Sequence, residues 1–83
     1  MYADKRELIG NIDKVHTTQM GLARIKSNLS LKNDDAVELC KSVIMDKNSS
    51  ISRKGKNWYI VLANIELTVN AHSFTIITAH TRS

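Results

Sequence analysis

The chain has 83 residues, a formal net charge of +4, no proline, three glycines and one cysteine. This length makes one domain, 1–83, near the size at which a single hydrophobic core is only just sufficient. The lone cysteine excludes an internal disulfide, and the spacing of Cys and His excludes a zinc site, so we expect no metal, nucleotide or organic cofactor. The charged N-terminus predicts no secretory signal and no membrane span, hence a cytoplasmic protein.

Apolar residues recur at helical spacing throughout residues 1–47. Stripes of this kind run through 4–15, 22–29 and 37–44. Residues able to cap each helix precede or begin these segments: Asp4, Thr17 or Thr18, and Asp34 or Asp35. Cys40 falls on the third stripe, which predicts a buried and inert thiol. We therefore predict two or three helices in this part of the chain.

After Ser50 the periodicity changes from helical to alternating. Runs rich in Val, Ile, Thr and aromatic residues predict strands at 51–54, 58–62, 65–69 and 74–79. The short connections between these runs allow only antiparallel neighbours, and Gly55 suits a hairpin turn. The predicted fold is α+β, with the N-terminal helices packed on one face of a four-stranded antiparallel meander in residues 48–83.

Strand alternation assigns one side of each strand to the core. Trp58 is expected there, because the only tryptophan of a small domain is usually buried. On the last strand the core-facing side begins with Phe74 and Ile76. Strict alternation then adds Thr78 and His80 to the same side. Packing does not explain two polar residues in that position, so they become candidates for function.

The positive charge is concentrated in the predicted sheet. Residues 1–48 hold eight Lys or Arg and seven Asp or Glu, a net charge of +1, whereas residues 49–83 hold four and one, a net charge of +3. A basic sheet suits an anionic partner such as RNA, although the same charge can serve solubility alone. The candidate nucleic-acid-binding residues are Arg53, Lys54, Lys56, Tyr59 and Arg82, with Tyr59 as a stacking platform for bases.

His72, His80 and Thr78 are the candidate catalytic residues. Imidazole gains and loses a proton near neutral pH, so two histidines can serve as acid and base in RNA cleavage. Thr78 can donate a hydrogen bond to the phosphate. The alternative is structural, since His72 falls in a predicted turn and His80 lies near the chain end. His16, followed by two threonines, is assigned to the start of a helix.

Three segments, HTTQMGLARI (16–25), RKGKNWY (53–59) and IELTVNAHSFTIITAH (65–80), resemble a family of short bacterial proteins of unknown function. This resemblance spans nearly the whole chain and implies no activity. The order of elements is also loosely similar to the barnase/RelE/colicin-type ribonuclease fold. That similarity implies that His, Lys, Arg and Thr on the sheet handle an RNA phosphate, although a shared fold does not establish function.

Three function classes follow from these observations. The first is a small bacterial RNA-directed protein, in its most specific form a metal-independent ribonuclease-like or toxin-like domain. The second is a protein-binding module, such as an inhibitor or regulator encoded by a mobile element. The third is a noncatalytic nucleic-acid binder. The expected partner is RNA or another anionic molecule, or a protein, and no membrane.

Overall fold

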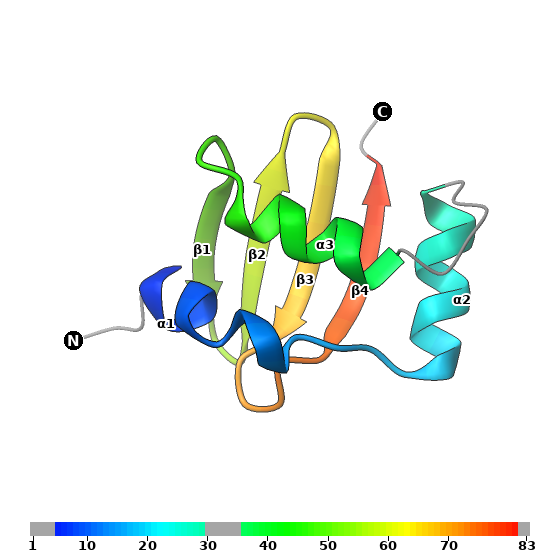
Figure 1. Ribbon diagram of the computed structural model, residues 1–83, viewed down its shortest axis with the longest axis horizontal. Helices are drawn as coiled ribbons and strands as arrows, with labels where there is room; N and C mark the ends of the chain where they lie inside the picture. Colours follow the sequence, from blue (N-terminus) through cyan, green and yellow to red (C-terminus); the bar gives the residue numbers. More distant parts are fainter. Residues whose placement is uncertain (1–4, 30–35, 82–83) are drawn as a thin grey trace.

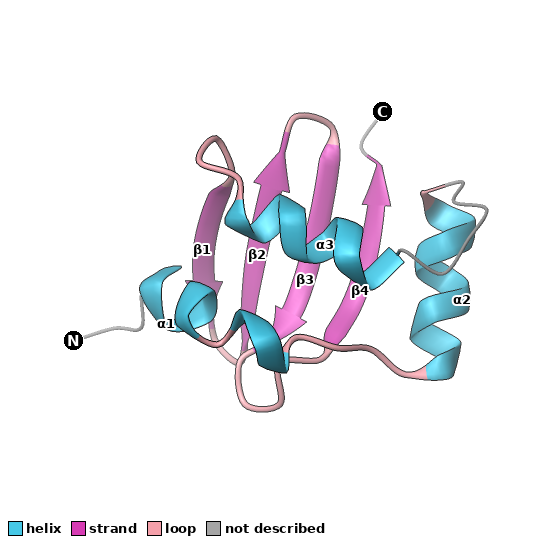
Figure 2. Ribbon diagram, in the orientation of Figure 1, coloured by secondary structure: helices cyan, strands magenta, loops and turns pink. Residues whose placement is uncertain are grey.

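The computed structural model describes residues 5–29 and 36–81. Its helices come first along the chain: α1 (Lys5–Gly10), the 3-10 helix η1 (Ile12–Lys14), α2 (Gln19–Asn28) and α3 (Ala36–Met45). The strands follow: β1 (Ser50–Lys54), β2 (Asn57–Leu62), β3 (Ile65–Asn70) and β4 (Ile76–Thr81). They form one antiparallel sheet in the order β1-β2-β3-β4 (Figure 1, Figure 2). The predicted α+β class and the meander are confirmed.

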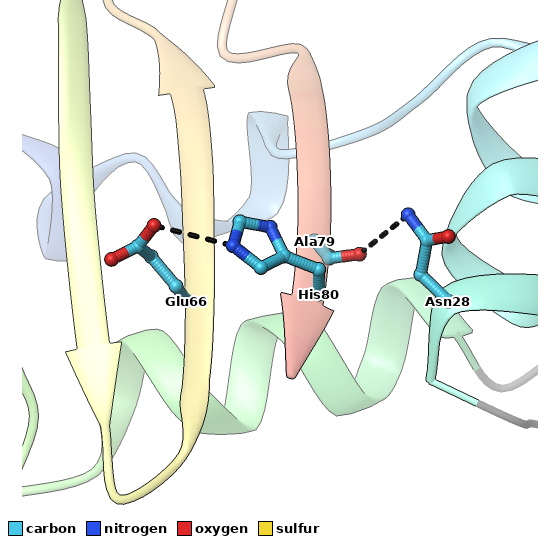
Figure 3. Close-up of polar contacts among 4 residues, drawn as sticks. All are labelled: Asn28, Glu66, Ala79 and His80. Atoms are coloured by element: carbon cyan, nitrogen blue, oxygen red, sulfur yellow. Dashed lines mark hydrogen bonds and ion pairs between the residues drawn. The ribbon is translucent and has the colours of Figure 1, made fainter. Parts of the chain in front are cut away.

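The helices cover one face of the sheet and one of its edges. α3 crosses that face (Figure 1), and α1 contributes Leu8, which is completely buried in the core. α2 lies beside β4, where Asn28 Nδ2 donates a hydrogen bond to the carbonyl oxygen of Ala79 at 3.2 Å (Figure 3). No helix in the described ranges is both long and apolar enough to cross a membrane.

The first predicted helix is interrupted. Instead of one helix over 4–15, α1 ends at Gly10 and η1 begins at Ile12. Glycine is a poor helix residue, and Asn11 Nδ2 donates to the carbonyl oxygen of Glu7 at 2.8 Å, which satisfies one of the last carbonyls of α1. At α2 the predicted cap is confirmed, because Thr18 Oγ1 accepts a hydrogen bond from Gly21 N at 3.0 Å. The other predicted caps lie outside the described residues.

The core is built from the helices and the two central strands, with contributions from β4. Its buried residues are Leu8, Val15, Ile25, Ala36, Cys40, Val43, Ile44, Trp58, Ile60, Leu67, Val69, Ala71, Ile76 and Ala79. Trp58 is completely buried, as predicted, and its ring centroid lies 5.5 Å from that of Phe74. Phe74 is only half-buried and precedes β4 rather than belonging to it.

The alternation predicted for the last strand is wrong beyond Ile76, because β4 contains a β-bulge. Thr78 pairs with Thr68, whereas Val69 pairs with Ile76, so Ile77 is an additional residue on β4. A bulge of this kind shifts the alternation by one position. Ile76 and Ala79 can therefore both enter the core, while Thr78 and His80 lie on the opposite face. The polar residues do not interrupt an apolar face; they belong to the other face.

Two hairpin turns begin with a residue of positive φ, Gly55 at 59° and Ala63 at 53°. Gly55→Ala should lower the free energy of unfolding by about 1 kcal/mol, because a side chain disfavours this conformation. The added Cβ would meet no atom within 4 Å, so the cost is conformational alone. Ala63→Gly should raise the free energy of unfolding by up to about 1 kcal/mol. Urea denaturation measures the free energy of unfolding of both variants. A change of this free energy in the same direction for Gly55→Ala and Ala63→Gly would contradict the turn geometry.

The bulge is tested by placing a carboxylate at two successive positions of β4. Ala79 is completely buried, so Ala79→Asp should cost several kcal/mol, comparable with the whole stability of a small domain. Thr78 is half-exposed on the opposite face, so Thr78→Asp should leave a folded protein with a clear thermal transition. Circular dichroism melts compare the two variants. The reverse result, with Thr78→Asp unfolded and Ala79→Asp folded, would indicate uninterrupted alternation.

Candidate nucleic-acid interface

The face of the sheet opposite the helices, which we call the open face, is lined mainly by polar side chains. Its residues form three cross-strand rows: Ser50–Val61–Glu66–His80, Ser52–Tyr59–Thr68–Thr78 and Lys54–Asn57–Asn70. The rows between them contain the buried sheet residues: Ile51–Ile60–Leu67–Ala79 and Arg53–Trp58–Val69–Ile76. The described part of the chain encloses no pocket.

Tyr59 occupies the central row of the open face. Its direct cross-strand partners are Ser52 on β1 and Thr68 on β3, and the residue is half-buried. Both partners have side chains much shorter than tyrosine, so the aromatic ring is the largest group of the row. An exposed ring on a sheet is a surface on which a planar base can stack. The hydroxyls beside it can donate and accept hydrogen bonds.

His80 and Glu66 form a cross-strand pair at one end of the open face. His80 Nε2 lies 3.3 Å from Glu66 Oε1, and the two side chains are 43% and 33% exposed (Figure 3). Thr78 lies on the same face, two residues from His80 along β4. Among the described strands, Glu66 supplies the one carboxylate. This end of the face can therefore accept hydrogen bonds as well as donate them.

The predicted basic residues are divided between the two faces. Lys54 belongs to the open face, and Lys56 is exposed in the turn between β1 and β2. Arg53 lies on the helix-covered side, with its guanidinium carbon 5.3 Å from the centroid of the Trp58 ring. Its Nε also donates to the carbonyl oxygen of Gly55 at 2.9 Å. Arg82 lies outside the described residues.

His72 and His80 are not brought together. His72 is exposed in the loop after β3, where its backbone N–H donates to Asn70 Oδ1 at 2.9 Å. His80 pairs with Glu66, which lies four residues before Asn70 on β3. At roughly 3.3 Å per residue, Glu66 and Asn70 are about 13 Å apart along the strand. The two histidines therefore lie near opposite ends of the sheet.

A polar network that the sequence analysis missed is centred on His16. Its Nδ1 lies 2.8 Å from the carbonyl oxygen of Lys14, and since a carbonyl only accepts, Nδ1 carries a proton. Its Nε2 lies 3.2 Å from Thr75 Oγ1. Thr75 Oγ1 in turn lies 2.7 Å from Ser73 Oγ, which lies 3.2 Å from Asn70 Oδ1. We call this set of side chains, His16, Thr75, Ser73 and Asn70, the His16 network.

Backbone contacts hold His16 against the segment that leads into β4. Its N–H donates to the carbonyl oxygen of Phe74 at 3.1 Å, and its own carbonyl oxygen accepts from the N–H of Ile76 at 2.7 Å. These bonds form an isolated parallel bridge between His16 and Thr75. His16 was assigned to the start of a helix because two threonines follow it, and its partner Thr75 lies 59 positions further along the chain. The one available signal was that both sides of the contact belong to segments of the family resemblance.

Phe74 adopts a positive φ of 58° between the two hydroxyl residues of the His16 network. This conformation costs a residue with a side chain on the order of 1–3 kcal/mol and persists only where its surroundings enforce it. Here the Phe74 N–H donates to the carbonyl oxygen of Asn70 at 2.9 Å, and the ring packs on Trp58. The Lys14 ammonium lies 5.9 Å from the centroid of the Phe74 ring. The loop is therefore held in one conformation by several independent contacts.

Cys40 is buried in the helical layer, as predicted. Burial raises the pKa of its thiol to about 11, because the charged thiolate would lose its solvation. The thiol is therefore protonated and unreactive near neutral pH. No group of three or more His, Cys, Asp or Glu side chains gathers as a metal site within residues 5–29 and 36–81.

Comparison with known proteins gives a family. A family model described as "Protein of unknown function (DUF3781)" matches residues 9–80, which include all four strands apart from the last residue of β4. The match also contains both segments that meet at His16. No curated protein and no solved structure matches the chain. The chain belongs to the family of proteins of unknown function DUF3781.

Proposed function

We propose that the protein binds single-stranded RNA on the open face of its sheet. The observation that carries this proposal is the half-buried Tyr59 in the central row of the open face, with hydroxyl side chains on both neighbouring strands. Sheets that bind single-stranded RNA stack bases on exposed aromatic rings and hydrogen-bond the base edges with nearby polar groups. The open face supplies both kinds of group on one rigid surface.

The charge distribution supports the same function. Lys54 lies on the open face and Lys56 is exposed in the adjoining turn. Residues 49–83 carry four basic and one acidic residue, a net charge of +3. Cations beside a stacking surface attract the phosphates of a strand whose bases lie on that surface. Arg53 does not belong to the open face, because its guanidinium is packed on Trp58 on the other side of the sheet.

Binding has more support than cleavage by the predicted pair His72 and His80. An acid and a base that act on one phosphate must both be within hydrogen-bond reach of it. These two histidines are separated along the sheet by about 13 Å at 3.3 Å per residue, too far for that role. His80, paired with Glu66, is better suited to hydrogen-bonding the edge of a stacked base.

Tyr59→Ala should weaken the binding of a short mixed-sequence RNA strand by about 5- to 150-fold, the equivalent of one stacked base at about 1–3 kcal/mol. Tyr59→Phe keeps the ring and should retain most of the affinity. Fluorescence anisotropy with an end-labelled strand measures the dissociation constants, and thermal melts verify that both variants fold. Equal affinities for Tyr59→Ala and the unchanged protein would exclude the open face as the binding surface.

Lys54→Ala should reduce the salt dependence of RNA binding. Each phosphate contact to a single strand contributes about 0.7 to the slope of log affinity against log salt concentration, so the slope should fall by about that amount. Lys47→Ala is the matched control, because Lys47 is exposed in the loop between α3 and β1 and belongs to no row of the open face. A complete lack of salt-dependent binding at micromolar protein would overturn the proposed function and favour a protein partner.

A further inference from the structure

The His16 network can accommodate His16 in both of its protonation states without moving a heavy atom. When His16 is neutral, the Thr75 hydroxyl donates to Nε2, and the Ser73 hydroxyl can donate to Thr75 Oγ1. When His16 is protonated, Nε2–H donates to Thr75 Oγ1 instead. The Thr75 hydroxyl then donates to Ser73 Oγ, and Ser73 donates to Asn70 Oδ1. Every donor has an acceptor in either state.

The network also allows Nε2 to take a different partner. Thr75 Oγ1 and Ser73 Oγ are 2.7 Å apart, and either atom can be the donor. If the Thr75 hydroxyl turns to Ser73, Nε2 of neutral His16 is free to accept a hydrogen bond from an incoming hydroxyl group. The Lys14 carbonyl meanwhile holds the proton on Nδ1 and fixes the tautomer. A fixed tautomer, an accessible Nε2 and partners for both protonation states are what a general base requires.

The surroundings of His16 favour a phosphodiester as the substrate. Asn70, the last member of the His16 network, also belongs to a row of the open face together with Lys54. The loop that contains Ser73 also contains His72, whose backbone N–H donates to the same Asn70 Oδ1 atom. Lys56 adjoins this loop, because its carbonyl oxygen accepts from the Ala71 N–H at 2.7 Å. A strand bound on the open face would therefore reach His16 beside a loop that contains the exposed His72 and adjoins the exposed Lys56.

We propose that His16, together with His72, cleaves the bound RNA strand at this end of the open face. The inference rests on the proposed RNA binding. It assigns the base to His16, which the sequence analysis gave to a helix start, and it pairs His72 with His16 rather than with His80. The reacting group is the ribose 2′-hydroxyl next to the scissile phosphate.

The step balances without a further reactant. His16 Nε2 removes the proton of the 2′-hydroxyl, and the 2′-oxygen attacks the neighbouring phosphorus. The 2′-O–P bond forms as the P–O5′ bond breaks, and the departing 5′-oxygen takes a proton from the His72 imidazolium. The products are a strand ending in a 2′,3′-cyclic phosphate and a strand with a free 5′-hydroxyl. Exchange of protons with water returns both histidines to their starting states.

His16→Asn tests this assignment with little disturbance of the fold. The asparagine Nδ2 can replace Nδ1–H as the donor to the Lys14 carbonyl, while nothing replaces Nε2. The full chain is incubated with end-labelled single-stranded RNA in EDTA, and fragments are separated on a denaturing gel. The cleavage rate should fall by about 10²–10⁴-fold in His16→Asn, and His72→Asn should also lower it. RNA affinity by anisotropy and the melting temperature should stay within error for His16→Asn, and Lys47→Ala should cleave normally.

Each other outcome has a definite meaning. A strand with 2′-deoxyribose at every position should bind without being cleaved, and cleavage of it would overturn the proposed step. Intact RNA after incubation with a protein that binds it would overturn the cleavage inference and leave the binding function standing. No binding at all would overturn both. Undiminished cleavage by His16→Asn, or cleavage lost in His80→Asn but not in His16→Asn, would exclude His16 as the base.

Discussion

One additional residue in β4, Ile77, determines which side chains the sheet presents on each face. The core requires Ile76 and Ala79 at the same time, because both pack beneath the helices. In a regular strand these two positions would point in opposite directions. The bulge at Ile77 removes this conflict and, as a consequence, turns Thr78 and His80 to the open face. The composition of the candidate interface thus depends on how the core is packed on the other side.

The helical part of the chain covers the outer edge of β4, and this coverage places His16 beside the segment that precedes β4. The outer edge of β4 is occupied by α2 and by the segment around His16, through the hydrogen bonds from Asn28 and Thr17 to the carbonyl oxygens of Ala79 and Ile76. This coverage protects a strand edge that would otherwise be free to pair with another chain. It also places the His16 imidazole next to Thr75, immediately before β4.

The two activities that we propose depend on different parts of one sheet. Tyr59 and its hydroxyl neighbours form a surface suited to stacking, which needs breadth and little depth. The His16 network lies where the loop between β3 and β4 is held by several contacts, including the stacking of Phe74 on Trp58. The proposed binding along the face and the proposed proton transfer at its end involve different side chains, since no residue of the His16 network belongs to the row of Tyr59.

The sequence by itself determined the order of the elements, the meander and much of the core. Periodicity is a local property, so the change from helical to alternating spacing after Ser50 and the burial of Trp58 follow from neighbouring residues alone. The family resemblance was likewise carried by contiguous segments, and the family is confirmed.

Only the tertiary structure decided which residues share a face and which partners His16 and His80 contact. The bulge depends on packing between β4 and the helices, which no spacing within the strand records. The contact between His16 and Thr75 joins residues 59 positions apart, and the stacking of Arg53 on Trp58 turns a predicted RNA contact toward the helices. Alternation assigns faces only while a strand is regular, and hydrogen bonds between distant segments leave no periodic pattern. For these physical reasons the strands, together with Lys54, Lys56 and Tyr59 of the candidate interface, could be predicted from the sequence, whereas the bulge and the contacts of His16 could not.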